Sequence, residues 1–129
     1  TVPQAILNSY YNHLREEAER KAKERKEEIY NKIPRIKEID SEMNRLGSRM
    51  TTALIGGNTT EKAQFEKMMD ELLAERAITL TENNYEMDYT DVKYSCEICK
   101  DTGLTDEGEK CQCMKLRIDE ARLWQEKRK

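Results

Sequence analysis

Four cysteines lie within eighteen residues and are the part of the chain best suited to chemistry. Cys96 and Cys99 form a C-x-x-C pair, and Cys111 and Cys113 form a C-x-C pair after a glycine-containing loop. Zn²⁺ binds four thiolates tetrahedrally at about 2.3 Å, and two closely spaced pairs allow two turns of the chain to approach one ion from opposite sides. The spacing therefore predicts a structural zinc site. Because all four ligands would be thiolates, no coordination position is left for a reacting water.

A disulfide and a redox-active dithiol are the alternative uses of these cysteines. A C-x-C disulfide would be strained, and the C-x-x-C lacks the βαβ pattern of a thioredoxin-like site. No signal peptide is visible, and the intracellular setting that we expect disfavours lasting disulfides. Cys113 also stands where a terminal helix is predicted to begin, so backbone N–H groups and the helix dipole would stabilise its thiolate. These points favour metal binding.

The rest of the chain shows no catalytic motif. It contains no G-x-x-x-x-G-K-[ST] phosphate loop, no G-x-S-x-G nucleophile motif and no H-E-x-x-H. Its only histidine, His13, lies far from the cysteines in a predicted helix. A half-exposed surface residue is the simpler interpretation of this histidine than a metal ligand or a general base. We therefore expect that the chain is not an enzyme.

Helical periodicity dominates the chain upstream of the cysteines. Apolar residues keep helical spacing from Gln4 to about Ile33, and Pro34 suits the first turn of a second helix that ends near Leu54. The apolar residues of the second helix alternate steps of three and four, which allows knobs-into-holes packing with a partner helix. We expect an intramolecular hairpin of the first two helices, with dimerisation through the same seam as the alternative. The seam consists of Ile36, Ile39, Met43, Leu46, Met50 and Ala53.

A third helix is expected after the pair Gly56-Gly57. Asn58 stands three residues before Glu61, which is the arrangement of a helix N-cap, and a broad apolar face follows as far as Leu80. The methionines of this face are interpreted as adaptable core residues. The overall prediction is a mainly α fold: three helices, as a hairpin or bundle, precede a small four-cysteine zinc module and a short C-terminal helix.

The predicted elements divide the chain into three segments. Residues 1–82 form a helical, partner-docking region, and residues 83–95 form a linker whose tyrosines pack on the cysteine region. Residues 96–129 form the zinc module with its terminal helix, which is expected to start at Met114. Trp124 in this helix is expected to cover a small hydrophobic patch.

Composition limits the classes of partner. The chain is 36% hydrophobic and 38% charged, a balance typical of helical and coiled-coil proteins. Residues 1–58 carry 11 Lys/Arg and 9 Asp/Glu, residues 59–95 carry 4 and 9, and residues 96–129 carry 8 and 8. No segment has the basic excess that is typical of nucleic-acid binding. No stretch of about 18 apolar residues exists, so we expect no membrane partner and a cytoplasmic location.

Two stretches of the sequence resemble a known family. The run from Tyr94 to Gly103, followed by Lys110 to Cys113, resembles the zinc module of the DnaI-type helicase loaders and their DnaC-like relatives in Gram-positive bacteria and phages. The upstream run from Ile29 to Asp40 and the pair Leu46-Gly47 resemble the helical segment that precedes this module. The similarity covers roughly residues 15–115.

This resemblance implies an adaptor. In that family an N-terminal helicase-binding domain precedes an AAA+ ATPase domain that binds ATP and single-stranded DNA, and the full loader delivers the hexameric replicative helicase to the origin. The chain stops before any ATPase motif. The resemblance therefore implies docking on the helicase at replication initiation, with ATP hydrolysis and single-strand contact in the AAA+ domain that is absent from this chain. We expect the helicase contact on the exposed face of the first helix around Tyr10, Tyr11 and Leu14, since adjacent tyrosines point to different sides of a helix.

Other functions stay open from the sequence alone. A single-stranded nucleic-acid-binding zinc module is one alternative, because aromatic and basic residues could stack on bases and neutralise phosphates. The N-terminal domain of a transposition helper ATPase, a relative of these loaders, is another. A DnaJ-like zinc region is disfavoured because only one cysteine cluster is present. The residues considered for nucleic-acid contact are Tyr94, Lys100, Lys110, Lys115 and Arg117.

Overall fold

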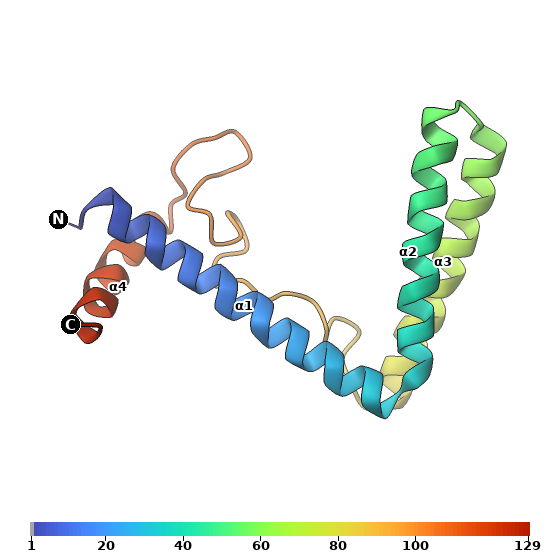
Figure 1. Cartoon of the computed structure of the whole chain (residues 1–129), viewed down its shortest axis with the longest axis horizontal. Helices are drawn as coiled ribbons and strands as arrows, with labels where there is room; N and C mark the ends of the chain where they lie inside the picture. The colour runs from blue at the N-terminus through green and yellow to red at the C-terminus, as the bar shows by residue number, and fades with distance from the viewer. Residues whose placement is uncertain (1) are drawn as a thin grey trace. The chain divides into compact units, whose positions relative to one another are not determined.

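The protein is described by a computed structural model in which residues 2–129 are placed, and these residues form four helices. The helices are α1 (Gln4–Lys32), α2 (Pro34–Ile55), α3 (Thr59–Glu82) and α4 (Met114–Lys127) (Figure 1). Residues 2–129 contain no strand, only an isolated antiparallel bridge between Leu104 and Lys110. The predicted mainly α fold with a four-cysteine module and a short last helix is confirmed. None of the described helices is long and apolar enough to cross a membrane.

The chain divides into two compact units. The metal-site unit consists of Thr1–Glu24 and Asp91–Lys129, and the hairpin unit consists of Arg25–Thr90. This division differs from the sequential segments that the sequence suggested, because α1 contributes its first part to one unit and its last part to the other. The cysteine region is short, and it completes its core only with residues of α1, including Leu7 and Tyr11.

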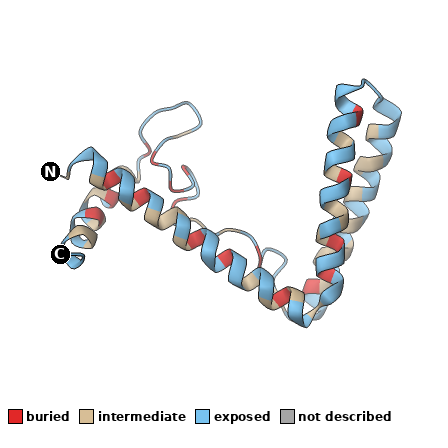
Figure 2. Ribbon diagram, in the orientation of Figure 1, coloured by how far each residue is buried: buried red, intermediate tan, exposed pale blue. Residues whose placement is uncertain are grey.

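The hairpin of the hairpin unit is made by α2 and α3, which lie side by side (Figure 1). The expectation that α2 would pair with α1 was wrong. A short connection reverses the chain between α2 and α3, and Gly57 in it has a φ of 73°, a left-handed conformation that suits glycine. Four of the six predicted seam residues of α2 are nevertheless buried (Figure 2), namely Ile36, Ile39, Leu46 and Ala53, and the two methionines of the seam are half-buried.

The predicted N-cap of α3 is confirmed. Asn58 Oδ1 accepts the backbone N–H of Glu61 at 3.0 Å, and Asn58 Nδ2 donates to the carboxylate of Glu61 at 2.9 Å. The first of these bonds satisfies one of the free N–H groups that every helix start exposes, and the second joins the two side chains. It fixes the point at which the chain turns back along α2.

The segment after α3 packs back on the hairpin unit. The hydroxyl groups of Tyr85 and Tyr89 donate to the two carboxylate oxygens of Glu28 in α1, at 3.0 and 2.8 Å. Arg25 Nε donates to the backbone carbonyl of Tyr89 at 2.8 Å. These two tyrosines therefore pack on α1, and the prediction that they would pack on the cysteine region was wrong, because Glu28 offers both hydroxyls an acceptor.

A partly buried ion pair ties α2 to α3. Arg76 Nε donates to Asp40 Oδ1 at 2.7 Å, and Tyr30 donates its hydroxyl to Asp40 Oδ2 at 2.6 Å. Arg76 also donates to the hydroxyl of Thr90 at 2.8 Å. Burial opposes ionisation of Asp40, but the Arg76 guanidinium and the Tyr30 hydroxyl outweigh it and hold the pKa of this carboxyl below its ordinary value.

Candidate metal centre

The four predicted ligands come together at one point. Their Sγ atoms all lie within 4.8 Å of one another, and none of them forms a disulfide. Close sulfur–sulfur contacts join Cys96 to Cys111 at 3.8 Å and Cys99 to Cys113 at 3.6 Å. Each contact pairs one residue of the C-x-x-C with one of the C-x-C, so the two turns face each other as the spacing predicted. The cluster can hold a metal ion.

Backbone hydrogen bonds shape the first turn. The N–H of Lys100 donates to the carbonyl of Cys96 at 2.8 Å. Asp101 then folds back, with a φ of 59°, and its carboxylate accepts the N–H groups of Ser95 and Cys96, each at 2.9 Å. The carboxylate belongs to one of the fully buried residues of the chain, and Arg15 of α1 donates to the Asp101 carbonyl. Asp101 therefore closes the loop that presents the first two ligands.

The second turn leads directly into α4. The N–H of Cys111 donates to the carbonyl of Gly103 at 2.8 Å, and the N–H of Met114 donates to the carbonyl of Cys111 at 3.0 Å. Cys113 is the N-cap residue of α4, which confirms its predicted place at the start of the terminal helix. Its side chain makes no capping bond to the helix backbone, so the expected stabilisation of its thiolate by the helix N–H groups is not observed. Its sulfur instead contacts Sγ of Cys99 at 3.6 Å.

Tyr11 of α1 completes the cluster. Its hydroxyl lies 3.1 Å from Sγ of Cys113, and only 2% of the residue is exposed. Gly103 has a φ of 81°, and a Cβ atom there would lie 2.8 Å from the Tyr11 ring. The glycine is thus required both by the backbone conformation and by the close approach of the tyrosine.

This position corrects the expectation that Tyr11 belongs to an exposed helicase-contact face. The ring of Tyr11 fills the space above Gly103, so it is inaccessible to a partner. Tyr10 is half-buried and donates its hydroxyl to Glu120 at 2.8 Å, and Leu14 is half-buried against the same core. Tyr10, Tyr11 and Leu14 therefore lie in one region of the metal-site unit, where their side chains pack mainly against its core.

Electrostatics decide how the thiols can ionise. Burial opposes ionisation of Cys96, but the backbone N–H groups of Cys99 and Ile98 and the neighbouring thiols outweigh it and lower the pKa of this thiol to about 7. Burial raises the pKa of Cys113 to about 12, and the neighbouring thiols add to this although the Tyr11 hydroxyl counteracts it. Thiolates so close together repel one another. A cation bound among the four sulfurs would offset this repulsion and favour their ionisation.

The aromatic residues near α4 form a separate group. His13 stacks on Trp124 with ring centroids 5.3 Å apart, and Tyr10 lies 5.4 Å from the same indole. The guanidinium of Arg128 lies 4.5 Å from the indole centroid. His13 is not part of the cysteine cluster, and Trp124 packs against α1 in a small aromatic patch, which agrees with the sequence interpretation of both residues.

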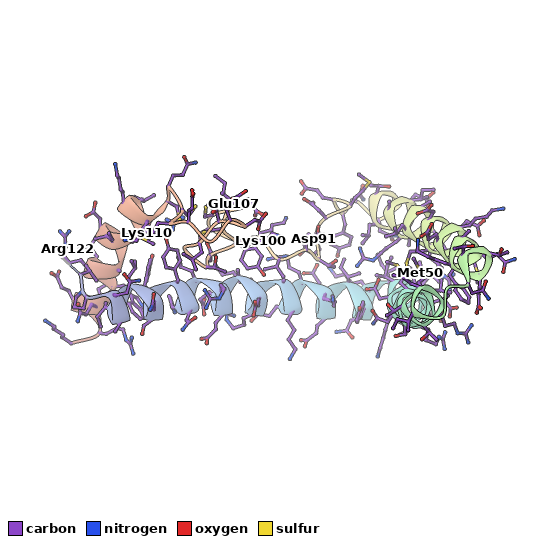
Figure 3. All side chains as sticks on the ribbon, turned by 90° about the horizontal axis from the view of Figure 1, so that it is seen from above. Met50, Asp91, Lys100, Glu107, Lys110 and Arg122 are labelled. Carbon is purple, nitrogen blue, oxygen red and sulfur yellow. The ribbon has the colours of Figure 1, made fainter. Side chains whose placement is uncertain are left out.

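The loops that carry the cysteines have a mixed surface. Figure 3 shows Lys100, Glu107 and Lys110 on these loops, and all three side chains are exposed. Between Cys96 and Cys113 the acidic residues outnumber the two lysines, Lys100 and Lys110. The lysines considered for nucleic-acid contact therefore have acidic neighbours that weaken their field.

Two supporting residues of the centre were not found from the sequence. Nothing in the local pattern distinguishes Asp101 from the other acidic residues of the loops, and Tyr11 is 102 positions away from Cys113. The positive φ of Asp101 and the need for an acceptor at the buried N–H of Cys96 are tertiary properties. Together these residues surround a buried group of four cysteines that can bind one metal ion. In comparisons with known proteins, the chain matches no protein-family model, no curated protein and no solved structure.

Proposed function

We propose that the chain is a zinc-stabilised, non-catalytic adaptor domain that docks on a replicative DNA helicase, in the manner of the N-terminal domain of a DnaI-type loader. The resemblance of Tyr94–Gly103 and Lys110–Cys113 to the zinc module of those loaders supports the family. The proposal places the domain in the cytoplasm, where replication takes place.

The sulfur positions support zinc as the ion. Four thiolates bound tetrahedrally at about 2.3 Å are separated from one another by about 3.8 Å. The contacts between Cys96 and Cys111 and between Cys99 and Cys113 are 3.8 and 3.6 Å. Zinc bound in this way is saturated by protein sulfur, so its role is to hold the metal-site unit together and not to activate water.

The observation that carries the docking proposal is the tip of the α2–α3 hairpin. Residues 50–60 contain no charged side chain, although 38% of the whole chain is charged. Leu54 and Ile55 at this tip are 63% and 83% exposed. Large aliphatic side chains this exposed, in a stretch without charge, fit an apolar cleft of a protein partner better than a phosphate backbone.

The test is a calorimetric titration of the zinc-loaded chain into the cognate helicase hexamer. The double variant Leu54→Ser/Ile55→Ser should weaken binding at least about tenfold, because two buried aliphatic contacts are each worth on the order of 1–2 kcal/mol. Ile78→Ser on α3, which removes an aliphatic side chain that is 56% exposed, is the matched control and should bind as the unaltered chain does.

A second titration, with a single-stranded oligonucleotide at two salt concentrations, tests the alternative. Binding to the oligonucleotide alone, with a steep loss at higher salt, would replace the adaptor proposal by a nucleic-acid-binding function. Helicase binding that the tip variant leaves unchanged would keep the adaptor but reject the tip as its contact.

A further inference from the structure

Arg117 in α4 is a buried cation with an unexplained donor. Its side chain is only 7% exposed, and its Nη1 donates to both carboxylate oxygens of Glu120, at 2.9 and 3.0 Å. Its Nε is buried and finds no hydrogen-bond partner among residues 2–129. Buried guanidinium groups are stable only when opposing charge lies near them. The Glu120 carboxylate provides part of that charge, but its side chain is 34% exposed.

The remaining opposing charge lies at the metal centre. Burial lowers the pKa of the Arg117 guanidinium, but Glu120 outweighs it and raises the pKa, and Cys113 and Asp101 add smaller contributions in the same direction. The backbone N–H of Arg117 also donates to the carbonyl of Cys113 at 3.0 Å, in the first turn of α4. Arg117 is therefore held beside the last of the four cysteines.

Tyr11 reaches the same cysteine from α1. Its hydroxyl lies 3.1 Å from the Cys113 sulfur. A metal-bound thiolate has no proton to donate, so the hydroxyl, which is protonated at neutral pH, is the donor of this hydrogen bond. A hydrogen bond to a charged acceptor is stronger than one between neutral groups.

These two residues face a centre with excess negative charge. Four thiolates and one Zn²⁺ carry a net charge of about −2. Such charge is unfavourable in a buried site, and it leaves the sulfurs electron-rich, hence open to electrophiles. Groups around a metal's ligands are known to tune both the retention of the ion and the basicity of the ligands.

We infer that Tyr11 and Arg117 offset the negative charge of the four-thiolate centre and keep Cys113 unreactive while the ion is bound. Tyr11 donates a hydrogen bond to the sulfur, and Arg117 places a buried positive charge beside it. Both residues act on the Cys113 sulfur, and neither binds the ion. The inference rests on zinc as the ion in the proposed function, and it does not depend on the helicase.

The test measures how fast an electrophile releases zinc from the full chain. Excess N-ethylmaleimide is added to the zinc-loaded protein, and released zinc is followed with a chromogenic chelator. The cysteine sulfur adds to the maleimide double bond, the resulting carbanion takes a proton from water, and the alkylated sulfur no longer binds zinc. Tyr11→Phe removes only the hydroxyl, and Arg117→Gln removes the positive charge while keeping a polar side chain.

Both variants should release zinc about tenfold faster, because a hydrogen bond to a charged group typically shifts such an equilibrium by one to two decades. Tyr10→Phe is the matched control, since its hydroxyl binds Glu120 and not a cysteine. It should release zinc within about twofold of the unaltered chain. Arg117→Lys keeps the positive charge and should restore most of the lost protection.

A second readout separates charge from packing. With Co²⁺ in place of zinc, Tyr11→Phe should shift the sulfur-to-cobalt charge-transfer band, while the d–d bands of a tetrahedral site stay unchanged. If Arg117→Gln does not fold, the comparison of Tyr11→Phe with Tyr10→Phe decides the matter.

Three results would overturn the inference. The first is release within twofold of the unaltered chain in both Tyr11→Phe and Arg117→Gln. The second is equal acceleration in Tyr10→Phe and Tyr11→Phe, which would assign the effect to packing. The third is a chain that binds no zinc at all, which would also remove the ion from the proposed function; a chain that binds zinc but no helicase would leave the inference intact.

Discussion

The carboxylate of Asp101 accepts the backbone N–H of Cys96 at 2.9 Å, so a fully buried acid holds the first of the four clustered cysteines in place. The other carboxylate oxygen accepts the N–H of Ser95, also at 2.9 Å. The side chain of Asp101 thus satisfies two N–H groups of the turn that carries Cys96 and Cys99.

Asp101→Asn should weaken zinc binding about tenfold, since an amide offers one acceptor oxygen where the turn presents two N–H donors. The measurement is competition for zinc against a chelator of known affinity. Asp106→Asn changes an exposed acid of the same region and should leave the affinity unchanged. Equal zinc affinity in Asp101→Asn and the unaltered chain would show that the carboxylate is dispensable for the turn.

Removal of the metal should unfold one unit and spare the other. Leu7 and Tyr11 of α1 form one core with the cysteines, so the loss should extend to the first part of α1 as well as to the cysteine region and α4. Hydrogen exchange of the zinc-loaded chain, of the chelated chain and of Cys96→Ser provides the measurement. Amides around Tyr11 should lose protection, whereas those around Ile39 in the hairpin unit should keep it. Unchanged protection near Tyr11 after chelation would contradict the assignment of this helix segment to the metal-site unit.

Two glycines with similar backbone angles should respond differently to alanine. Gly57 has a φ of 73° and nothing within 4 Å of its added Cβ, so Gly57→Ala should cost only the left-handed strain, about 1 kcal/mol. Gly103 has a φ of 81°, and its added Cβ would overlap the buried Tyr11 ring. Gly103→Ala should destabilise the metal-site unit by about 3 kcal/mol or more, since overpacking adds to the strain. Chemical denaturation of the two variants provides the comparison, and equal effects would argue against the close packing of Tyr11 on Gly103.

The hairpin unit should lose stability in acid through Asp40. Arg76 and Tyr30 hold the folded pKa of Asp40 below its ordinary value of about 4, so the folded state binds this proton less tightly than the unfolded state does. The stability that the ionised Asp40 adds to the folded hairpin unit is therefore fully present above a pH of about 4. It is lost as the pH falls through the folded pKa of Asp40.

Asp40→Asn should lower the stability of the hairpin unit at pH 7 by about 1–3 kcal/mol, because the partly buried Arg76 loses its charged partner. Its stability should also fall less between about pH 5 and pH 2 than that of the unaltered chain. Thermal unfolding across this range gives both quantities. Asp70→Asn, at an exposed position of α3, is the control. An acid transition of equal size in Asp40→Asn and the unaltered chain would remove Asp40 as its source.

Local patterns in the sequence predicted local structure well. The spacing of Cys96 and Cys113 with their partners indicated one metal site, and the four sulfurs do meet. Asn58 and Glu61 indicated the start of α3, because a helix cap depends only on residues three apart. The alternating seam of α2 likewise identified its buried face.

These local patterns did not predict contacts between segments that are far apart in the sequence. The seam from Ile36 to Ala53 shows that α2 needs a partner but not which helix supplies it, and the turn at Gly57 gives that role to α3. The apolar and polar faces of Tyr11 suit a partner surface as well as a core, so only the folded chain places it on Cys113. No sequence pattern marked Asp101 as structurally important, because its role depends on a positive φ and on two backbone N–H groups that only the fold brings to it.

X-ray absorption at the zinc edge of the purified chain would show whether the four cysteines bind one zinc ion. We expect one zinc per chain with four sulfur neighbours at about 2.3 Å and no nitrogen or oxygen ligand. Loss of one sulfur neighbour in Cys113→Ser should accompany weaker binding. A chain that retains no zinc under reducing conditions, or a zinc site with nitrogen or oxygen neighbours, would rule out a closed four-thiolate centre.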